Sequence, residues 1–88
     1  MPHSSRRGII REHEFEMQLS ALVPNLEEAD EFTAAAEDLL SEDPFIGMPL
    51  STDDIWILPM APIRGADVWL YYRFDERTVV FLAILPFD

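Results

Sequence analysis

The segment that most constrains the fold of this chain is residues 79–85, Val-Val-Phe-Leu-Ala-Ile-Leu, which are apolar at every position. Successive side chains of a strand point to opposite faces, so a strand with one solvated face alternates apolar and polar residues. Because residues 79–85 do not alternate, we expect an interior strand that is covered on both faces. No apolar run reaches the roughly 18 residues of a membrane-spanning helix, so we expect no membrane association.

The length of the chain and its lack of cysteine narrow the classes of protein that it can form. With 88 residues in all, residues 9–88 are expected to form a single domain behind a tail of residues 1–8. The absence of cysteine excludes a disulfide framework and a thiolate metal site. The basic N-terminal residues are not followed by the apolar segment of a secretory signal, which favours a cytoplasmic location.

The charge of the chain bears on its partners. Seventeen acidic and six basic residues give a net charge of −11, and every basic residue is an arginine. This charge repels phosphate backbones, so we expect no direct binding to free nucleic acid. The acid-rich segment 27–43 has two interpretations, a solvated helix face or a surface that steers a basic partner.

Turn residues and apolar periodicity predict an α+β domain with the order β-α-α-β-β-β. The expected elements are a strand at 9–15, helices at 16–23 and from about 26 to 41, and strands at 54–58, 68–74 and 78–85. Asn25 followed by Glu28 predicts a cap for the second helix. Residues 59–67, with two prolines and a glycine, are expected to form a loop. We therefore expect two helices packed on a mostly antiparallel four-stranded sheet.

Three local motifs resemble those of the RelE/ParE toxin superfamily, and most closely RelE-type toxins of the HigB-like kind. They are Phe-Glu-Met-Gln-Leu-Ser-Ala-Leu at 15–22, Asp-Pro-Phe-Ile-Gly-Met-Pro-Leu at 43–50, and Val-Trp-Leu-Tyr-Tyr at 68–72 with Asp-Glu at 75–76 and the apolar run after them. The resemblance implies the toxin of a bacterial type II toxin–antitoxin system, bound by a cognate antitoxin. Nuclease members of the family cleave mRNA on the ribosome, and others poison gyrase.

The basic residues of the family's nuclease site are missing from this sequence. Where the family has Lys-Ile-Arg, this chain has Asp-Ile-Trp at 54–56, and Val68 stands where an arginine opens the third strand. The C-terminal segment is Leu-Pro-Phe-Asp at 85–88, whose Pro86 and Phe87 cannot transfer a proton. These differences favour a divergent toxin that acts through protein contacts, without ribonuclease activity.

A ribosome-dependent mRNA endonuclease with a rewired site remains an alternative. Its weak catalytic candidates are Arg64, Tyr72 and Arg73. Arg64 is otherwise a solvated loop residue. Arg73 and Arg77 are otherwise partners of Asp75 or Glu76 in salt bridges at a hairpin.

One face of the third strand is the expected partner-binding surface. The set Val68, Leu70, Tyr72 and Phe74 is apolar where the resemblance implies a cleft, whereas Trp69 should pack against the helices. We expect the antitoxin, or a second copy in a homodimer, to cover that set.

A further alternative is a non-enzymatic acidic interaction module, either a homodimeric regulator or a nucleic-acid mimic. We expect no cofactor and no metal site, because strand alternation would place His13 away from Glu12 and Glu14.

Overall fold

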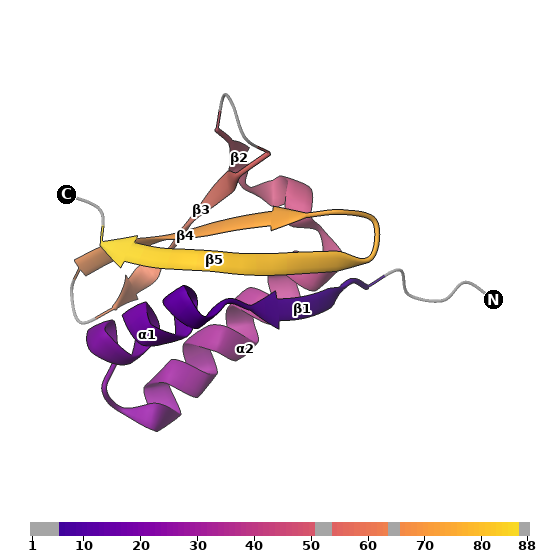
Figure 1. Ribbon diagram of the computed structural model, residues 1–88. Coiled ribbons are helices and arrows are strands. Elements are labelled where there is room, and N and C mark those ends of the chain that lie inside the picture. Colours follow the sequence, from indigo (N-terminus) through magenta and orange to yellow (C-terminus); the bar gives the residue numbers. More distant parts are fainter. Residues whose placement is uncertain (1–5, 51–53, 64–65, 87–88) are drawn as a thin grey trace.

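Two helices lie against one face of a five-stranded mixed sheet in the computed structural model, which describes residues 6–50, 54–63 and 66–86 (Figure 1). The elements in chain order are β1 (Gly8–Arg11), α1 (His13–Leu22), α2 (Leu26–Glu42), the 3-10 helix η1 (Pro44–Ile46), β2 (Met48–Pro49), β3 (Trp56–Ile63), β4 (Ala66–Phe74) and β5 (Thr78–Pro86). The strand order is β1-β5-β4-β3-β2, with β1 parallel to β5 and the other pairs antiparallel. The predicted α+β class is confirmed, and β2 raises the strand count from four to five.

The N-terminal strand is shorter than predicted and the first helix begins earlier. Strand β1 ends at Arg11, and the Glu12 amide donates the next hydrogen bond to the Phe81 carbonyl at 3.0 Å before the chain turns into α1. Phe15 and Leu19 are both buried, because residues four apart share one face of a helix. Placing Phe15 in the strand was therefore wrong, since its burial requires helical spacing to Leu19.

Helix α2 begins where the sequence predicts. The Asn25 side chain accepts a hydrogen bond from the Glu28 amide at 3.0 Å, which satisfies one of the free N–H groups at the helix start. The buried stripe of α2 consists of Ala29, Thr33, Ala36, Leu40 and Ser41. Leu39, which the apolar pattern assigns to this stripe, is instead 49% exposed.

Much of the expected loop at 59–67 is strand. Strand β3 continues through Pro59 to Ile63, and β4 begins at Ala66; residues 64–65 lie outside the described part. Beyond Ile57, the pairings recorded for β3 are with β4 alone, since β2 contacts only Trp56 and Ile57. An edge strand tolerates proline because its outer N–H groups have no ladder partner. The prolines therefore misled the loop prediction.

A β-bulge decides which side chains of β5 face the helices. Tyr71 pairs with Ala83 and Tyr72 pairs with Phe81, so Leu82 is an additional residue between the two pairs. The bulge shifts the alternation, and Phe81 and Ile84 are both fully buried although they are three residues apart.

The helix-facing side of β4 forms the core of the protein. Val68, Leu70 and Tyr72 are fully buried in one cluster with residues of α1, α2 and β5. The expectation that this side is open was therefore wrong. Trp69 and Tyr71 lie on the opposite side of the sheet, so the expectation that Trp69 packs against the helices was wrong as well. Strand β5 is interior to the sheet, as predicted, with β1 and β4 as its neighbours, but the described helices cover only one of its two faces.

Candidate functional site

Among the described residues, no helix covers the side of the sheet opposite α1 and α2, and we call this side the open face (Figure 1). Side chains that pair across antiparallel strands share a face, so the register assigns its members. They are Ile10, Met48, Ile57, Pro59, Trp69, Tyr71, Arg73, Val80, Ala83 and Leu85.

The open face is apolar and partly exposed. Ile10 is 51% exposed, Met48 49% and Leu85 38%, and the Trp69 and Tyr71 side chains are half-buried. Ile57, on the same face, is only 5% exposed, so the exposed apolar side chains are spread over this face. Several exposed apolar side chains on one face are typical of an interaction site. Arg73 is the one basic residue that the described register places on it.

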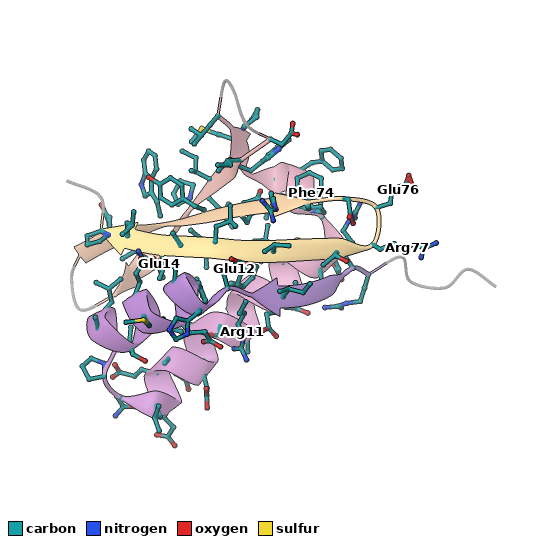
Figure 2. The ribbon with its side chains drawn as sticks, in the orientation of Figure 1. Arg11, Glu12, Glu14, Phe74, Glu76 and Arg77 are labelled. Carbon is teal, nitrogen blue, oxygen red and sulfur yellow. The ribbon has the colours of Figure 1, made fainter. Side chains whose placement is uncertain are left out.

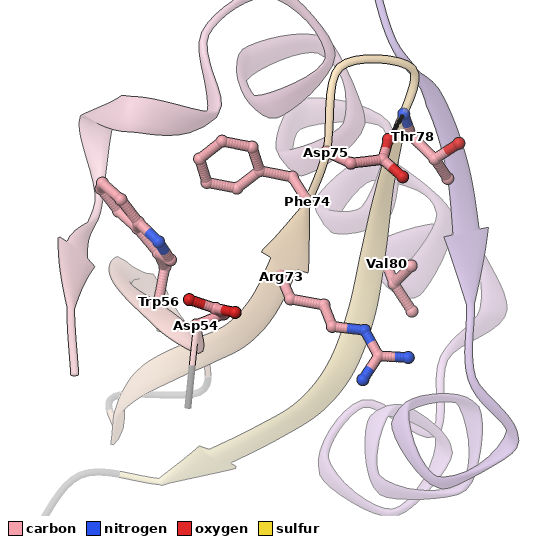
Figure 3. A pocket seen from close by; sticks show the side chains of 7 residues that line it. All are labelled: Asp54, Trp56, Arg73, Phe74, Asp75, Thr78 and Val80. Atoms are coloured by element: carbon pink, nitrogen blue, oxygen red, sulfur yellow. Dashed lines mark hydrogen bonds between the residues drawn. The ribbon is translucent and has the colours of Figure 1, made fainter. Parts of the chain in front are cut away.

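A pocket of about 280 Å³ lies beside the open face, where β4 turns into β5 (Figure 3). We call it the hairpin pocket; its lining residues are Asp54, Trp56, Arg73, Phe74, Asp75, Thr78 and Val80. It joins the start of β3 to the β4–β5 turn, which lies about twenty residues further along the chain. The start of β3, the end of β4 and the start of β5 therefore build this pocket.

Aromatic rings form one wall of the hairpin pocket. The Trp56 and Phe74 ring centroids are 5.2 Å apart in an edge-to-face arrangement. Phe45 from η1 contacts both rings, at 5.7 Å from Trp56 and 4.9 Å from Phe74. Edge-to-face pairs are favourable beyond their burial, so they fix the orientation of this wall.

The charged groups of the pocket come from the two ends of the wall. The Asp75 carboxylate accepts hydrogen bonds from the Arg77 and Thr78 amides, both at 2.8 Å, and these bonds lower the pKa of Asp75 below its usual value. Asp54 has a φ of 57°, in the left-handed region that aspartate tolerates better than most residues. Arg73 extends over β5, on the side away from Trp56 (Figure 3).

The predicted catalytic candidates do not form one site. Arg64 lies outside the described residues. The Tyr72 hydroxyl faces the core, where it donates to the Pro44 carbonyl at 2.6 Å and accepts from the Gly47 amide at 3.1 Å. Burial raises the pKa of Tyr72 to about 12, which disfavours proton release near neutral pH. Arg73 is on the other face of β4, so the structure separates it from Tyr72.

The predicted salt bridges at the hairpin are replaced by other contacts. In the described part of the chain, neither Arg73 nor Arg77 forms an ion pair with Asp75 or Glu76. Glu76 and Arg77 point outward from the turn (Figure 2). The Asp75 carboxylate instead holds the backbone of the turn.

Arg6, which precedes β1, and Arg11, the last residue of β1, pair with acidic residues of the helices. Arg6 contacts Asp38 at 2.8 Å and Glu42 at 3.5 Å, and Arg11 contacts Glu16 at 3.5 Å and Glu37 at 3.7 Å. These pairs are exposed, so each contributes little to stability. They show that part of the acidic surface serves this chain itself.

Sequence reasoning missed the open face and most of the hairpin pocket. In the sequence, Asp54 and Trp56 are notable only as replacements of the family's basic residues, and no sequence pattern assigns Thr78 or Val80 to a site. Alternation along β4 does separate Trp69 and Tyr71 from Leu70 and Tyr72. It does not indicate which of the two sets faces the helices, because both are apolar.

The described residues contain neither a metal-binding cluster nor a membrane-spanning helix. No group of three or more histidine, aspartate and glutamate side chains within them is arranged to hold a metal ion. His13 is exposed at the start of α1. No described helix combines the length and apolar character needed to cross a membrane.

Comparisons with known proteins identify the fold. No protein-family model and no curated protein matches the sequence. Among solved structures, a chain of the toxin–antitoxin complex RelBE2 from Mycobacterium tuberculosis is similar, with a TM-score of 0.70 and 24% sequence identity. The match covers 93% of this chain and 92% of that chain. The chain therefore has the fold of a RelE-like toxin.

Proposed function

We propose that this protein is the toxin-family component of a bacterial toxin–antitoxin pair and that it acts in the cytoplasm through protein contacts. The observation that carries the proposal is the RelE-like fold, which extends over 93% of the chain. The similar structure is described as a toxin–antitoxin complex, which supports an antitoxin partner for this chain.

The open face is the surface that we propose for the antitoxin. It exposes Ile10, Met48 and Leu85, and leaving such surface in water forgoes about 25 cal/mol for each Å² that could be buried. In the absence of antitoxin, we propose that a second copy of the chain covers the same face. The helix-facing side of β4 is unsuited to this role because Val68, Leu70 and Tyr72 are fully buried.

We further propose that the ribonuclease site is degenerate. Val68, at the position of the family's arginine, is in the core, and the neighbouring outward positions on β4 carry Asp67 and Trp69. Neither side chain can offset negative charge that develops on a phosphate. Arg73 is left as the basic group of the described open face, and Tyr72, the other described catalytic candidate, lies on the opposite face of β4.

Co-expression with the neighbouring small reading frame tests the toxin assignment. Induction of this chain alone should slow growth, and induction together with its neighbour should restore growth and yield a co-purifying complex. Leu85→Asp, on the open face, should weaken that complex, whereas Asp30→Asn, on the exposed side of α2, should not. Normal growth on induction alone and no complex with either neighbouring gene product would favour the acidic interaction module instead.

A direct assay tests the loss of ribonuclease activity. Purified protein added to translating ribosomes should leave mRNA intact, as mapped by primer extension. Codon-positioned cleavage that disappears in Arg73→Ala would reverse the proposal and establish the rewired endonuclease. A gyrase supercoiling assay and a ribosome pelleting assay then separate the two targets known among such toxins.

A further inference from the structure

We propose that the hairpin pocket binds an arginine or lysine side chain of a basic segment in the protein partner. The proposal rests on the proposed function for the identity of that partner as an antitoxin, but the pocket itself is tested separately. It reverses the charge pattern that the family resemblance implies, in which the toxin contributes the basic groups.

The lining of the pocket fits a cation. Among the lining residues, Asp54 and Asp75 contribute two carboxylates and Arg73 one guanidinium, while Arg7 and Arg77 act on Asp75 from outside the lining. Trp56 and Phe74 contribute aromatic rings, whose faces attract a cation. One of the two Asp75 carboxylate oxygens accepts both turn hydrogen bonds, and the described residues record no protein partner for the other.

A guanidinium already contacts this aromatic wall within the chain. The Arg7 guanidinium carbon lies 5.7 Å from the centroid of the Phe74 ring, and its Nε donates to the Asp75 backbone carbonyl at 2.7 Å. Arg7 thus hydrogen-bonds the carbonyl of Asp75, and its charge, like that of Arg77, also acts on the Asp75 carboxylate. The contact shows that the edge of this sheet accommodates an arginine against Phe74.

The charge of the whole chain favours the same occupant. A net charge of −11 attracts a basic segment and repels a nucleotide phosphate before either reaches the pocket. Arg73 lines one side only and extends over β5, away from the aromatic wall (Figure 3). An anion bound at Arg73 would share the pocket with the Asp54 and Asp75 carboxylates, which would repel it.

The experiment uses the two tryptophans of the chain as separate reporters. Trp56 lines the hairpin pocket and Trp69 lies on the open face, so their indole N–H signals in a nitrogen-15 spectrum distinguish the two surfaces. The probe is a capped leucine–arginine–leucine tripeptide, and its control is the same peptide with neutral citrulline in place of arginine. The arginine peptide should shift the Trp56 signal, and the citrulline peptide should bind about fivefold more weakly or worse.

Two variants of the pocket should change the affinity in opposite directions. Asp54→Asn removes a charge and keeps a side chain that tolerates a positive φ, so it should weaken binding about two- to fivefold. Arg73→Ala removes the like charge and should strengthen binding. Asp30→Asn changes the net charge equally on α2 and should leave the affinity within about 1.5-fold of the unmodified chain.

Three results would overturn the assignment of the pocket. The first is an unchanged Trp56 signal on adding the arginine peptide. The second is equal affinity for the arginine and citrulline peptides. The third is weaker binding of the arginine peptide by Arg73→Ala, together with a shift of the Trp56 signal when uridine monophosphate is added. The last result would make the pocket an anion site. Copurification of the neighbouring gene product despite a failed peptide titration would remove this proposal alone. If the arginine peptide binds but no neighbouring gene product forms a complex with the chain, the pocket assignment stands and the toxin assignment is contradicted.

Discussion

The Tyr72 hydroxyl donates a 2.6 Å hydrogen bond to the carbonyl oxygen of Pro44, 28 residues earlier in the chain. The same hydroxyl accepts from the Gly47 amide at 3.1 Å. Two bonds to one oxygen thus join η1 and the segment after it to the middle of β4. This contact holds Phe45 beside the wall of the hairpin pocket, so a core tyrosine positions a surface site.

Replacing that hydroxyl tests its structural role. Tyr72→Phe should lower the free energy of unfolding by about 1–3 kcal/mol, because the Pro44 carbonyl and Gly47 amide lose their partner in a buried place. Tyr71→Phe, on the open face, should change it by less than about 0.5 kcal/mol. Urea unfolding followed by circular dichroism measures both, and equal effects would contradict the distinction.

The two glycines flanking the helical region should respond oppositely to alanine. A Cβ at Gly47 would collide with the Tyr72 hydroxyl and approach the Ile57 carbonyl oxygen to 2.6 Å, so Gly47→Ala should cost about 1–3 kcal/mol. At Gly8 the nearest atom would be 3.9 Å away, and Gly8→Ala should stabilise the fold by about 0.4–1 kcal/mol. Thermal unfolding of the pair is the measurement, and a neutral Gly47→Ala would show that η1 can move.

The alkaline limit of stability should depend on Tyr72. Its pKa is about 12 in the folded chain and 10.0 by reference, so the folded state holds the proton more tightly. The resulting stabilisation is fully present below pH 10.0 and is lost as the pH rises towards about 12. In urea titrations across this interval, the free energy of unfolding of Tyr72→Phe should fall less steeply with pH than that of the unmodified chain. An equal fall in both would exclude the Tyr72 hydroxyl as its source.

Asp75 should contribute to the acid limit in the opposite sense. Hydrogen bonds from the Arg77 and Thr78 amides lower its folded pKa below the reference value of 3.8. The contribution of the Asp75 carboxylate to the free energy of unfolding is therefore present above pH 3.8. It is lost as the pH falls through the lower pKa of the folded state. Asp75→Ala should be less stable than the unmodified chain near neutral pH, and the difference should shrink on acidification. A difference independent of pH would exclude the carboxylate as its source.

The two sides of the sheet should respond differently to a buried or exposed charge. Leu70→Asp should unfold the chain, because a carboxylate in a fully buried position costs more than about 4 kcal/mol. Leu85→Asp should keep the fold, because Leu85 is already 38% exposed on the open face. Dispersion of amide signals in a nitrogen-15 spectrum reports both outcomes, and a folded Leu70→Asp would mean that the core is assigned to the wrong side.

The order of elements was predictable because each has a local signal. Asn25 caps α2 as its sequence indicates, and the apolar run of β5 places it inside the sheet. The start of α1 was missed because Glu12, its N-terminal flanking residue, makes no side-chain cap. Strand β2 was not predicted at all, because a strand of two residues has no periodicity.

The candidate site depended on information that is not local. Leu82 forms a bulge because β5 has one more residue than β4 between the Tyr71–Ala83 and Tyr72–Phe81 pairs. This difference depends on how the two strands pair, so the sequence of β5 alone does not indicate it. Trp56 and Phe74 meet although Trp56 begins β3 and Phe74 ends β4, so nearly two strands separate them in the chain. Alternation along β4 predicted which side chains share a face. Only the packing of the helices shows which of the two faces is buried.

The parallel pairing of β1 with β5 has a consequence for synthesis of the protein. Gly8 to Arg11 pair with Thr78 to Phe81, so β1 has no partner until the chain has been synthesised through the start of β5. At the usual rate of about 5–20 residues per second, α1 and α2 wait several seconds with Phe15 and Leu40 uncovered. The open face therefore cannot form before β5 has left the ribosome, so a partner that needs this face can bind only after that point.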